Sequence, residues 1–321
     1  MNRIEELRRH IAPNARGVEI GAYYNPITPR SQGFRAVHLD LLDGEVQRER
    51  ATADPHLTAA DVERIEPVEL VGSAVNIADL VTAKYGAEEF DYVVSSHNLE
   101  HLPNPIKFLQ GCQQILRSGG VLSMALPDLR YCFDFYRTRT EVAEWLEAYE
   151  ENRTRPTRAQ LFQWQALASN VEGNATWDAS ASSFPVPWDL MWRAVEYWEG
   201  TAEPEFLDAH CWVFTPASFR LLIEDLRHLG FHQFDVESIS PPSGCEFFVH
   251  LRHAPGSTAL DDAEPYADRR ARTMRQMVEE AAEVTAQFAV DDVESDARES
   301  SPQAVRLTRR WAPWRSRRKS S

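Results

Sequence analysis

Two apolar runs separated by a helix-like segment form the clearest pattern in the chain. Short, largely apolar runs are typical of parallel strands that are covered on both faces, and residues 92–94 and 121–126 have this character. Between these runs, Asn104-Pro105 has the features of a helix start and Gly119-Gly120 those of a helix stop, which predicts a helix that ends after Arg117. The pattern therefore predicts a strand–helix–strand unit.

Polar residues collect at the points where these two strands end. In open α/β sheets, ligands bind outside the carboxyl ends of the strands. The residues predicted to lie at this ligand-facing edge are Ser95, Ser96, His97 and Asp128.

The alternation of strands and helices continues on both sides of this unit. The spacing of Ile4, Leu7 and Ile11 predicts a short leading helix. Further strands are predicted at 17–21, 36–39 and 68–71, with a helix at 77–85. Near the other end, a helix starts at Thr215-Pro216, and two antiparallel strands at 234–239 and 246–251 flank a Pro-Pro-Ser-Gly turn. We therefore expect an α/β fold with a mostly parallel, Rossmann-like sheet and an antiparallel last strand.

Residues 131–209 interrupt this rhythm. They contain six of the nine tryptophans and little strand character, so we expect several helices with a proline-rich turn at SSFPVPW. We predict that this aromatic-rich insertion forms a helical cap at the substrate site of a main domain built from 1–130 and 210–253. An accessory amphipathic helix is predicted within 254–288, and 289–321 has the composition of a disordered tail, acidic first and then basic.

Charge and composition narrow the function classes. The formal net charge of −15 argues against broad nucleic-acid binding, which needs a basic surface. The four cysteines are scattered without a CxxC pair, so neither a zinc site nor a disulfide framework is indicated, and we expect a reducing cytoplasm. We expect no transmembrane helix and no signal peptide, because no apolar run is long enough and the first residues are charged.

Several of these segments together resemble class I S-adenosylmethionine-dependent methyltransferases. The resemblance rests on GVEIG at 17–21, Asp40, FDYVVSSHNLEHL at 90–102, LRSGGVLSMALPD at 116–128 and the closing strand pair. It points to the bacterial type 11 methyltransferases, which include relatives found with glycan-assembly enzymes. The resemblance implies a seven-stranded sheet with an antiparallel final strand, and S-adenosyl-L-methionine as the cofactor.

The resemblance also implies which residues hold that cofactor. The loop from Gly21 to Asn25 matches the first cofactor motif, and Asp40 matches the acid that binds the ribose hydroxyls. The 73–76 turn matches the adenine side, and 95–97 matches the methionine side. The implied cofactor-binding residues are Glu19, Gly21, Ala22, Tyr23, Asn25, Asp40, Ala74, Val75, Asn76, Ser95, Ser96 and His97. An acid at this position also suits a nicotinamide-dinucleotide fold, but the missing GxGxxG and the FD…EHL segment disfavour NAD.

The first cofactor motif departs from the family's pattern. The usual ExGxGxG is Glu19-Ile-Gly21-Ala-Tyr23-Tyr-Asn25 in this chain, without the second and third glycines. Such glycines permit positive φ angles and a close approach of the backbone to a ligand. Because Asn tolerates the left-handed region, we expect Asn25 to replace the last glycine, whereas Tyr23 adopts that region only at an energetic cost.

Several polar residues are candidates for catalysis. His97, Glu100 and His101 share a face if they begin a helical turn, and such a cluster can brace the loop, act in catalysis or hold a cation. Bracing is the simplest account, so no metal is expected. His210 is either a base that faces the methyl group or an anchor for the insertion, and Asp128 is either at the acceptor site or a turn former. The candidate catalytic residues are therefore His210, His97, His101 and Asp128.

The resemblance to the methyltransferases implies methyl transfer, and by analogy with that family we expect the acceptor to be a hydroxyl of a sugar, a glycan or another small molecule. The alternatives are a non-catalytic binding or scaffold subunit, because the glycine loop is degraded, and an NAD-dependent reductase. Basic residues between 306 and 319, together with two tryptophans, either make a peripheral membrane contact or offset the acidic stretch before them. The sequence predicts no oligomeric state.

Overall fold

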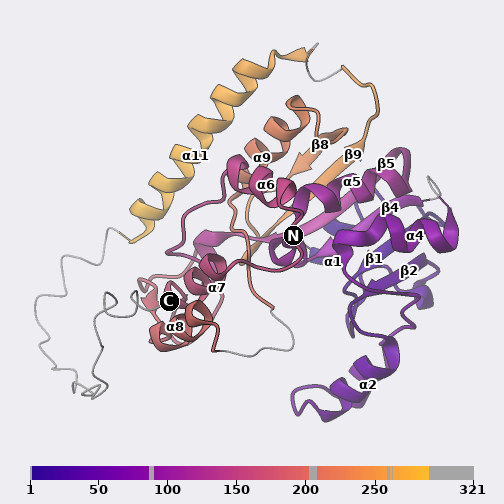
Figure 1. Cartoon of the computed structure of the whole chain (residues 1–321), viewed down its shortest axis with the longest axis horizontal. Helices are drawn as coiled ribbons and strands as arrows, with labels where there is room; N and C mark the ends of the chain where they lie inside the picture. The colour runs from indigo at the N-terminus through magenta and orange to yellow at the C-terminus, as the bar shows by residue number, and fades with distance from the viewer. Residues whose placement is uncertain (1, 87–89, 202–207, 259–260, 262, 289–321) are drawn as a thin grey trace, which may run out of the picture. The chain divides into compact units, whose positions relative to one another are not determined.

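A seven-stranded sheet forms the centre of the computed structural model, which describes residues 2–86, 90–201, 208–258, 261 and 263–288 (Figure 1). The strand order is β3-β2-β1-β4-β5-β9-β8. The first five strands pair in parallel, and β9 is antiparallel to both of its neighbours, which confirms the predicted sheet. The strands are β1 (Arg16–Ile20), β2 (Arg35–Asp40), β3 (Leu70–Val71), β4 (Phe90–Ser96), β5 (Leu116–Pro127), β8 (Phe234–Ile239) and β9 (Glu246–His253).

Apolar side chains cover the sheet on both faces. Along β4, Val93 belongs to one core cluster, and its neighbours Tyr92 and Val94 belong to the other. This follows from the geometry of a strand, in which successive side chains point to opposite faces. Gly17 is required in β1 because a Cβ there would lie 2.1 Å from the ring of Tyr92. The covering helices include α1 (Arg3–Leu7), α4 (Ile77–Tyr85), α5 (Pro105–Ile115) and α9 (Pro216–His228).

The register of the central strands aligns their carboxyl ends. Ile20 of β1 lies opposite Leu39 of β2 and opposite Ser95 of β4. The residues that follow these strands therefore start from the same edge of the sheet. Short helices α2 (Gly44–Ala53) and α3 (Ala59–Glu63) follow β2 on the way to β3.

The glycine pair after α5 has a different role from the one predicted. The helix ends at Ile115 rather than at Arg117, and the chain enters β5 directly. Leu116 is fully buried and pairs with Phe90 of β4, so strand pairing begins before the glycines are reached. Gly119, at a φ of 79°, and Gly120 therefore lie within β5. The prediction of a helix stop at this pair was wrong.

In its described residues the insertion contains helices α6 (Val142–Glu150), α7 (Arg158–Ala166) and α8 (Met191–Glu199), and a two-stranded sheet of β6 (Ser169–Asn170) and β7 (Val186–Pro187). Trp145 of α6 is fully buried, and its ring lies edge-on to that of Trp212 at a centroid distance of 6.2 Å. Both belong to the core cluster of the sheet, so α6 packs as part of the main body. Residues 1–288 form one compact unit.

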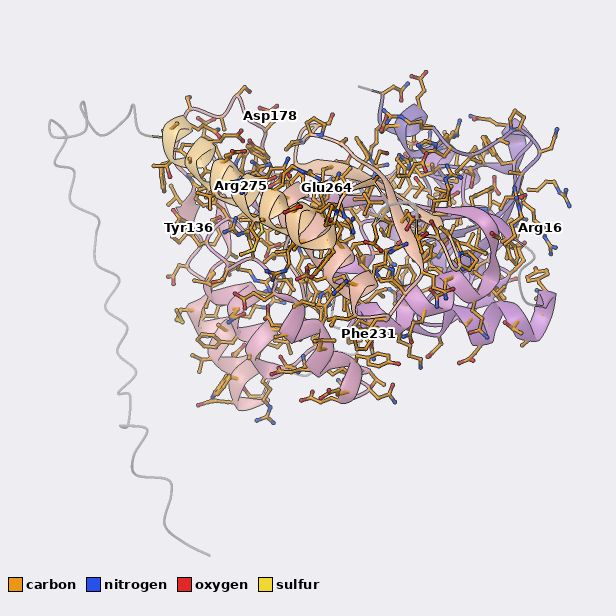
Figure 2. All side chains as sticks on the ribbon, turned by 90° about the horizontal axis from the view of Figure 1, so that it is seen from above. Arg16, Tyr136, Asp178, Phe231, Glu264 and Arg275 are labelled. Carbon is orange, nitrogen blue, oxygen red and sulfur yellow. The ribbon has the colours of Figure 1, made fainter. Side chains whose placement is uncertain are left out.

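The predicted accessory helix is α11 (Tyr266–Phe288), which runs along the outside of the body (Figure 2). It packs on α9, where Glu280 accepts a hydrogen bond from the backbone N–H of Ala217. None of the helices in the described segments combines the length and apolarity that a membrane span requires. The predicted tail at 289–321 lies outside the described residues.

Candidate functional site

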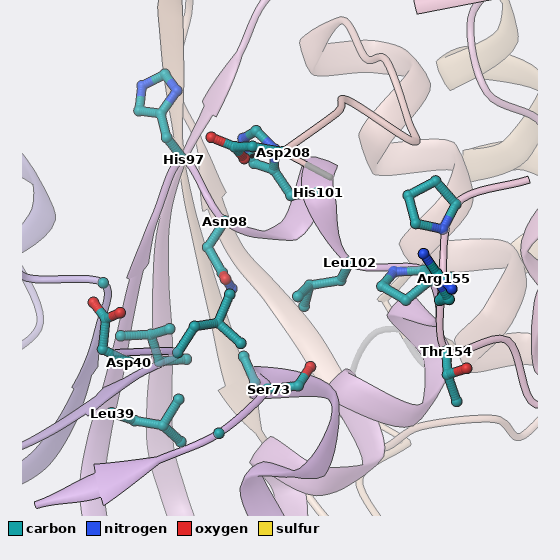
Figure 3. Close-up of a pocket in the computed structure, with 17 residues that line it drawn as sticks. Leu39, Asp40, Ser73, His97, Asn98, His101, Leu102, Thr154, Arg155 and Asp208 are labelled. Atoms are coloured by element: carbon teal, nitrogen blue, oxygen red, sulfur yellow. Dashed lines mark ion pairs between the residues drawn. The ribbon is translucent and has the colours of Figure 1, made fainter. Parts of the chain in front are cut away.

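A cavity of about 620 Å³ lies at the carboxyl ends of β1, β2 and β4 (Figure 3). Its volume falls in the range of small-molecule sites, about 300–1,000 Å³. Strand ends form one part of the wall, the segment after β4 another, and the insertion a third. The lining residues are Ile20, Gly21, Leu39, Asp40, Leu41, Gly72, Ser73, Ala74, His97, Asn98, His101, Leu102, Pro103, Thr154, Arg155, Pro156 and Asp208.

Gly21 and Asp40 line this cavity together. The N–H of Gly21 donates to the carbonyl of Leu39, which fixes the loop after β1 against the end of β2. Oδ1 of Asp40 accepts a hydrogen bond from the N–H of Leu42 at 3.1 Å. Burial raises the pKa of the Asp40 carboxyl, and the hydrogen bond from Leu42 opposes that shift. The Asp40 carboxylate therefore stands at the cavity wall, and as an acceptor-only group it can take further hydrogen bonds there.

Glu19 lies beneath the loop that Gly21 begins. Its carboxylate is 1% exposed and accepts hydrogen bonds from the N–H of Ile27 at 2.5 Å and from the N–H of Thr28 at 2.7 Å. The hydroxyl of Thr28 donates to the same carboxylate at 2.6 Å. Glu19 thus holds the backbone of the loop in place at Ile27 and Thr28. It is not one of the described residues that line the cavity.

The left-handed residue of this loop is Tyr23 and not Asn25. Gly21 has a φ of 67° and Tyr23 a φ of 43°, whereas Asn25 is not among the described residues of positive φ. The N–H of Asn25 closes a turn on the carbonyl of Ala22, which places Tyr23 inside the turn. The expectation that Asn25 replaces the last glycine was therefore wrong. A bulky residue in this region carries strain, and strained residues concentrate at functional sites.

His97 is a second left-handed residue at the cavity, with a φ of 46°. Its Nε2 lies 2.8 Å from Oε2 of Glu246, and its Nδ1 lies 3.4 Å from Oε1 of Glu100. Desolvation acts to lower the pKa of His97, but the two carboxylates outweigh it and raise the pKa to about 9. His97 is therefore an imidazolium at neutral pH, which suits charge stabilisation better than proton removal.

His101 and His210 meet beside the cavity although they are far apart in the sequence. Their rings are perpendicular, with centroids 4.7 Å apart. Nδ1 of His101 lies 2.8 Å from Oδ1 of Asp208, and Nδ1 of His210 lies 2.5 Å from Oδ2 of Asp134. His101 lines the cavity with Asp208 beside it (Figure 3), and His210 lies behind it with 8% of its surface exposed.

Comparison of the sequence with known protein families identifies the family of the chain. The chain matches the sequence profile of the methyltransferase domain family over residues 2–232. It belongs to that family. No curated protein matches the chain in sequence.

Among solved structures, the methyltransferase is similar to a Pyrococcus horikoshii protein at 14% identity and a TM-score of 0.40, over 78% of this chain and 89% of that one. It is also similar to an S-adenosylmethionine-dependent methyltransferase from Methanosarcina mazei at 13% identity and a TM-score of 0.39, over 79% and 98% of the two chains. An S-adenosylmethionine-dependent methyltransferase from Mesorhizobium loti has 13% identity and a TM-score of 0.40, over 78% and 97%.

Asp128 occupies a different environment from the candidate histidines His97, His101 and His210. It is fully buried, and its two carboxylate oxygens accept hydrogen bonds from Nε and Nη2 of Arg130 at 2.9 and 2.7 Å. Arg130 also contacts Glu283 of α11 at 3.2 Å. Burial raises the pKa of Asp128, against the effect of Arg130. Asp128 lies outside the cavity wall that the described residues form, and its contacts tie β5 to α11.

The other predicted cofactor residues lie around the cavity rather than in its wall. Of the implied set, Gly21, Asp40, Ala74 and His97 line it. Three polar side chains among the rest have protein partners: Ser95 accepts from Asn98 at 3.0 Å, Ser96 from Arg3 at 2.5 Å, and Asn76 from Lys107 at 2.8 Å. Val75 is buried, and Ala22 and Tyr23 line a much smaller hollow beside Asp40.

Two groups of cavity residues escaped sequence analysis. Asn98 stands next to His97 in the HNLEH segment, so its position in the motif was a usable signal. Thr154, Arg155 and Pro156 follow α6 and come from the insertion. No local pattern marks them, because only the packing of the insertion on the sheet brings them to the cavity.

Proposed function

We propose that the protein transfers the methyl group of S-adenosyl-L-methionine to a hydroxyl of a small acceptor. The observation that carries this proposal is that Gly21 and Asp40 line one cavity, with His97 and His101 in another part of its wall. Membership of the methyltransferase domain family supports the reaction class. The acceptor class, a sugar, a glycan or another hydroxylated molecule of a bacterial pathway, rests on the resemblance of the sequence alone.

The residues present fit such a cofactor. Asp40 offers a carboxylate to a pair of ribose hydroxyls, the kind of charge-assisted contact that is stronger than a neutral hydrogen bond. Ala74 and Leu102 give the wall an apolar part that suits a flat base, and Ser73 adds a hydroxyl beside them. Positively charged His97 and Arg155 also line the cavity and suit the carboxylate of the amino-acid portion.

The chain's main contribution to catalysis is positioning. The bound cofactor supplies an electrophilic methyl group, which forms a bond to the acceptor oxygen as its bond to sulfur breaks. Holding the acceptor in line contributes about 7–11 kcal/mol, whereas a general base adds about 10²–10⁴-fold in rate. We assign the handling of the acceptor hydroxyl to the pair of His101 and His210, each of which has a carboxylate next to its Nδ1.

Calorimetric titration of the whole protein with S-adenosyl-L-methionine tests this function. We expect saturable heat with one equivalent of cofactor, and none with NAD. An absence of heat at millimolar cofactor overturns the proposal and favours a non-catalytic scaffold subunit, whereas heat with NAD favours a reductase. Methyl transfer from labelled cofactor to a panel of sugars, glycans and amines then tests the acceptor class, and labelling of amines alone contradicts the hydroxyl assignment.

A further inference from the structure

The side chain of Glu100 is completely buried, with ionic neighbours but no hydrogen-bond partner among the described residues. It is 0% exposed, and neither carboxylate oxygen makes a hydrogen bond within the described part of the chain. Its nearest charged neighbours are ring nitrogens, Nδ1 of His97 at 3.4 Å and Nε2 of His101 at 3.7 Å from Oε1. A buried carboxylate is costly unless it is paired, hydrogen-bonded or coordinated to a metal.

The two imidazoles beside Glu100 are arranged as metal ligands are. Nδ1 of His210 is hydrogen-bonded to the carboxylate of Asp134 at 2.5 Å, and Nδ1 of His101 lies 2.8 Å from a carboxylate oxygen of Asp208. Metal-ligating histidines almost always have such a carboxylate or carbonyl behind them, which fixes the ring and raises its basicity. One ligand atom from each of Glu100, His101 and His210 lies within 4.8 Å of the others.

We propose that Glu100, His101 and His210 bind a divalent transition-metal ion. The donor set is one carboxylate oxygen and two imidazole nitrogens, which leaves coordination positions open to a further ligand. Metal–ligand bonds of about 2.0–2.2 Å place donors about 3.3–3.6 Å apart in a tetrahedral site. Side-chain rotations that bring these donor atoms about 1 Å closer together give the spacing of a tetrahedral site.

The donors favour a transition metal over Mg²⁺. Imidazole nitrogen suits Zn²⁺, Co²⁺ and Fe²⁺, whereas Mg²⁺ prefers carboxylate, carbonyl and water oxygens. The surroundings also favour a cation, because four carboxylates, of Glu100, Asp134, Asp208 and Glu246, gather there with three cationic groups, Arg137, Arg3 and His97. His97 is left out of the ligand set because it does not belong to the described group whose ligand atoms lie within 4.8 Å of one another, and both of its ring nitrogens face carboxylates.

The ion would sit beside the cavity, since His101 and Asp208 are part of the cavity wall. Its role rests on the proposed function: an acceptor hydroxyl on an open coordination position becomes more acidic and is held in one orientation. Its proton then leaves to solvent as the oxygen takes the methyl group, and His101 and His210 act on the acceptor through the metal.

Metal titration of the chelator-treated full chain tests the site without any assay of activity. Co²⁺ provides visible absorption bands that report its ligand geometry, and Zn²⁺ provides a calorimetric isotherm. We expect one equivalent of each to bind, with protons released as the imidazoles and carboxylate take up the ion. Excess Mg²⁺ should not displace Co²⁺, and full displacement by Mg²⁺ overturns the choice of a transition metal.

Variants separate this site from adventitious binding. Glu100→Gln and His210→Ala should abolish the Co²⁺ bands, and Asp208→Asn should weaken binding by about 10–100-fold. The Asp208 side chain is 68% exposed, so its variant changes the support of His101 without disturbing the core. His56→Ala, an exposed histidine after α2, serves as the matched control and should bind as the wild type does.

No Co²⁺ binding by the wild type overturns the proposal, as does equal binding by the wild type, Glu100→Gln and Asp208→Asn. Cofactor titration of the metal-free protein distinguishes the two proposals. If the protein binds metal but not S-adenosyl-L-methionine, the proposed function is wrong and the metal site stands. If it binds S-adenosyl-L-methionine but not metal, only the metal site is wrong.

Discussion

The N–H and the hydroxyl of Thr28 both donate to Oε2 of Glu19, at 2.7 and 2.6 Å. Both residues are buried, so this contact ties the loop that begins at Gly21 to the end of β1. The loop lacks two of the glycines of its motif, and a strained Tyr23 stands within it. The buried carboxylate of Glu19 therefore fixes the conformation of this loop through its three hydrogen bonds.

The first prediction concerns Glu19→Gln. An amide cannot accept hydrogen bonds through its nitrogen, so one of the N–H donors of Ile27 and Thr28 is left without an acceptor in a buried site. We expect the free energy of unfolding to fall by about 2–3 kcal/mol, measured by urea denaturation, with weaker cofactor binding by calorimetry. Glu49→Gln, at an exposed position, is the control, and equal stability of both variants contradicts this role of Glu19.

Asp40→Asn tests the ribose contact. The substitution keeps the size of the side chain and removes its charge, so the charge-assisted hydrogen bonds to ribose hydroxyls are lost. We expect cofactor affinity to fall by about 10–100-fold in calorimetric titration, with the fold unchanged by circular dichroism. Asp79→Asn makes the same change at an exposed position in α4 and should keep wild-type affinity. Unchanged affinity of Asp40→Asn removes this residue from the cofactor site.

His210→Ala tests the acceptor side of the site. His210 is held by Asp134 and lies behind His101, so its loss should impair handling of the acceptor hydroxyl and not cofactor binding. We expect turnover to fall by at least about tenfold while the affinity for cofactor stays the same. His56→Ala should keep wild-type turnover. A His210→Ala enzyme with full steady-state turnover would exclude the residue from the mechanism.

Asp128→Asn distinguishes a structural from a catalytic aspartate. Both oxygens of Asp128 are engaged by Arg130, and removal of one partner of a buried ion pair costs about 3–5 kcal/mol. We expect a large loss of unfolding free energy, with turnover per folded molecule retained below the melting temperature. The exposed Asp189→Asn variant should match the wild type in both measurements. Loss of turnover at unchanged stability would instead support the catalytic role predicted from the sequence.

His232 should make stability fall in mild acid. Its Nε2 lies 3.1 Å from the carbonyl of Ile223, and its Nδ1 accepts from the N–H of Phe234, so only the neutral ring satisfies both. Burial lowers the pKa of His232 to about 3, below the value of about 6.5 in an unfolded chain. The unfolded state therefore takes up more protons as the pH falls below about 6.5, and the stability present above that pH is progressively lost toward pH 3.

The expected contribution of His232 is a loss of about 2 kcal/mol in unfolding free energy between about pH 7 and 5. Urea denaturation at the two pH values should show this loss of unfolding free energy in the wild type and in the control His56→Gln. In His232→Gln the decrease in unfolding free energy should be smaller by about 2 kcal/mol. His250, whose pKa burial lowers to about 4, adds a change of the same sign in all three proteins. An identical pH dependence in His232→Gln would contradict the assignment.

Local patterns determined most of the sheet. The apolar runs of β4 and β5 predicted strands because burial on two faces is a property of each segment by itself. The same alternation gave the antiparallel end of the sheet and the common edge at which Gly21, Asp40 and His97 lie. Local rules failed at Gly119, where strand pairing began before the helix-stop signal, and at Asn25, where the turn placed Tyr23 in the left-handed region.

Only the tertiary structure decided the partners of the site. Asp128 follows a strand as a ligand-binding acid would, yet Arg130, two residues later, takes both of its oxygens. His210 reaches His101 because the N–H of Cys211 donates to the carbonyl of Glu100 at 2.7 Å, a contact across a long stretch of chain. Sequence spacing carries no information on such a contact, since it forms only when the insertion packs on the sheet and satisfies backbone groups that burial would otherwise leave unpaired.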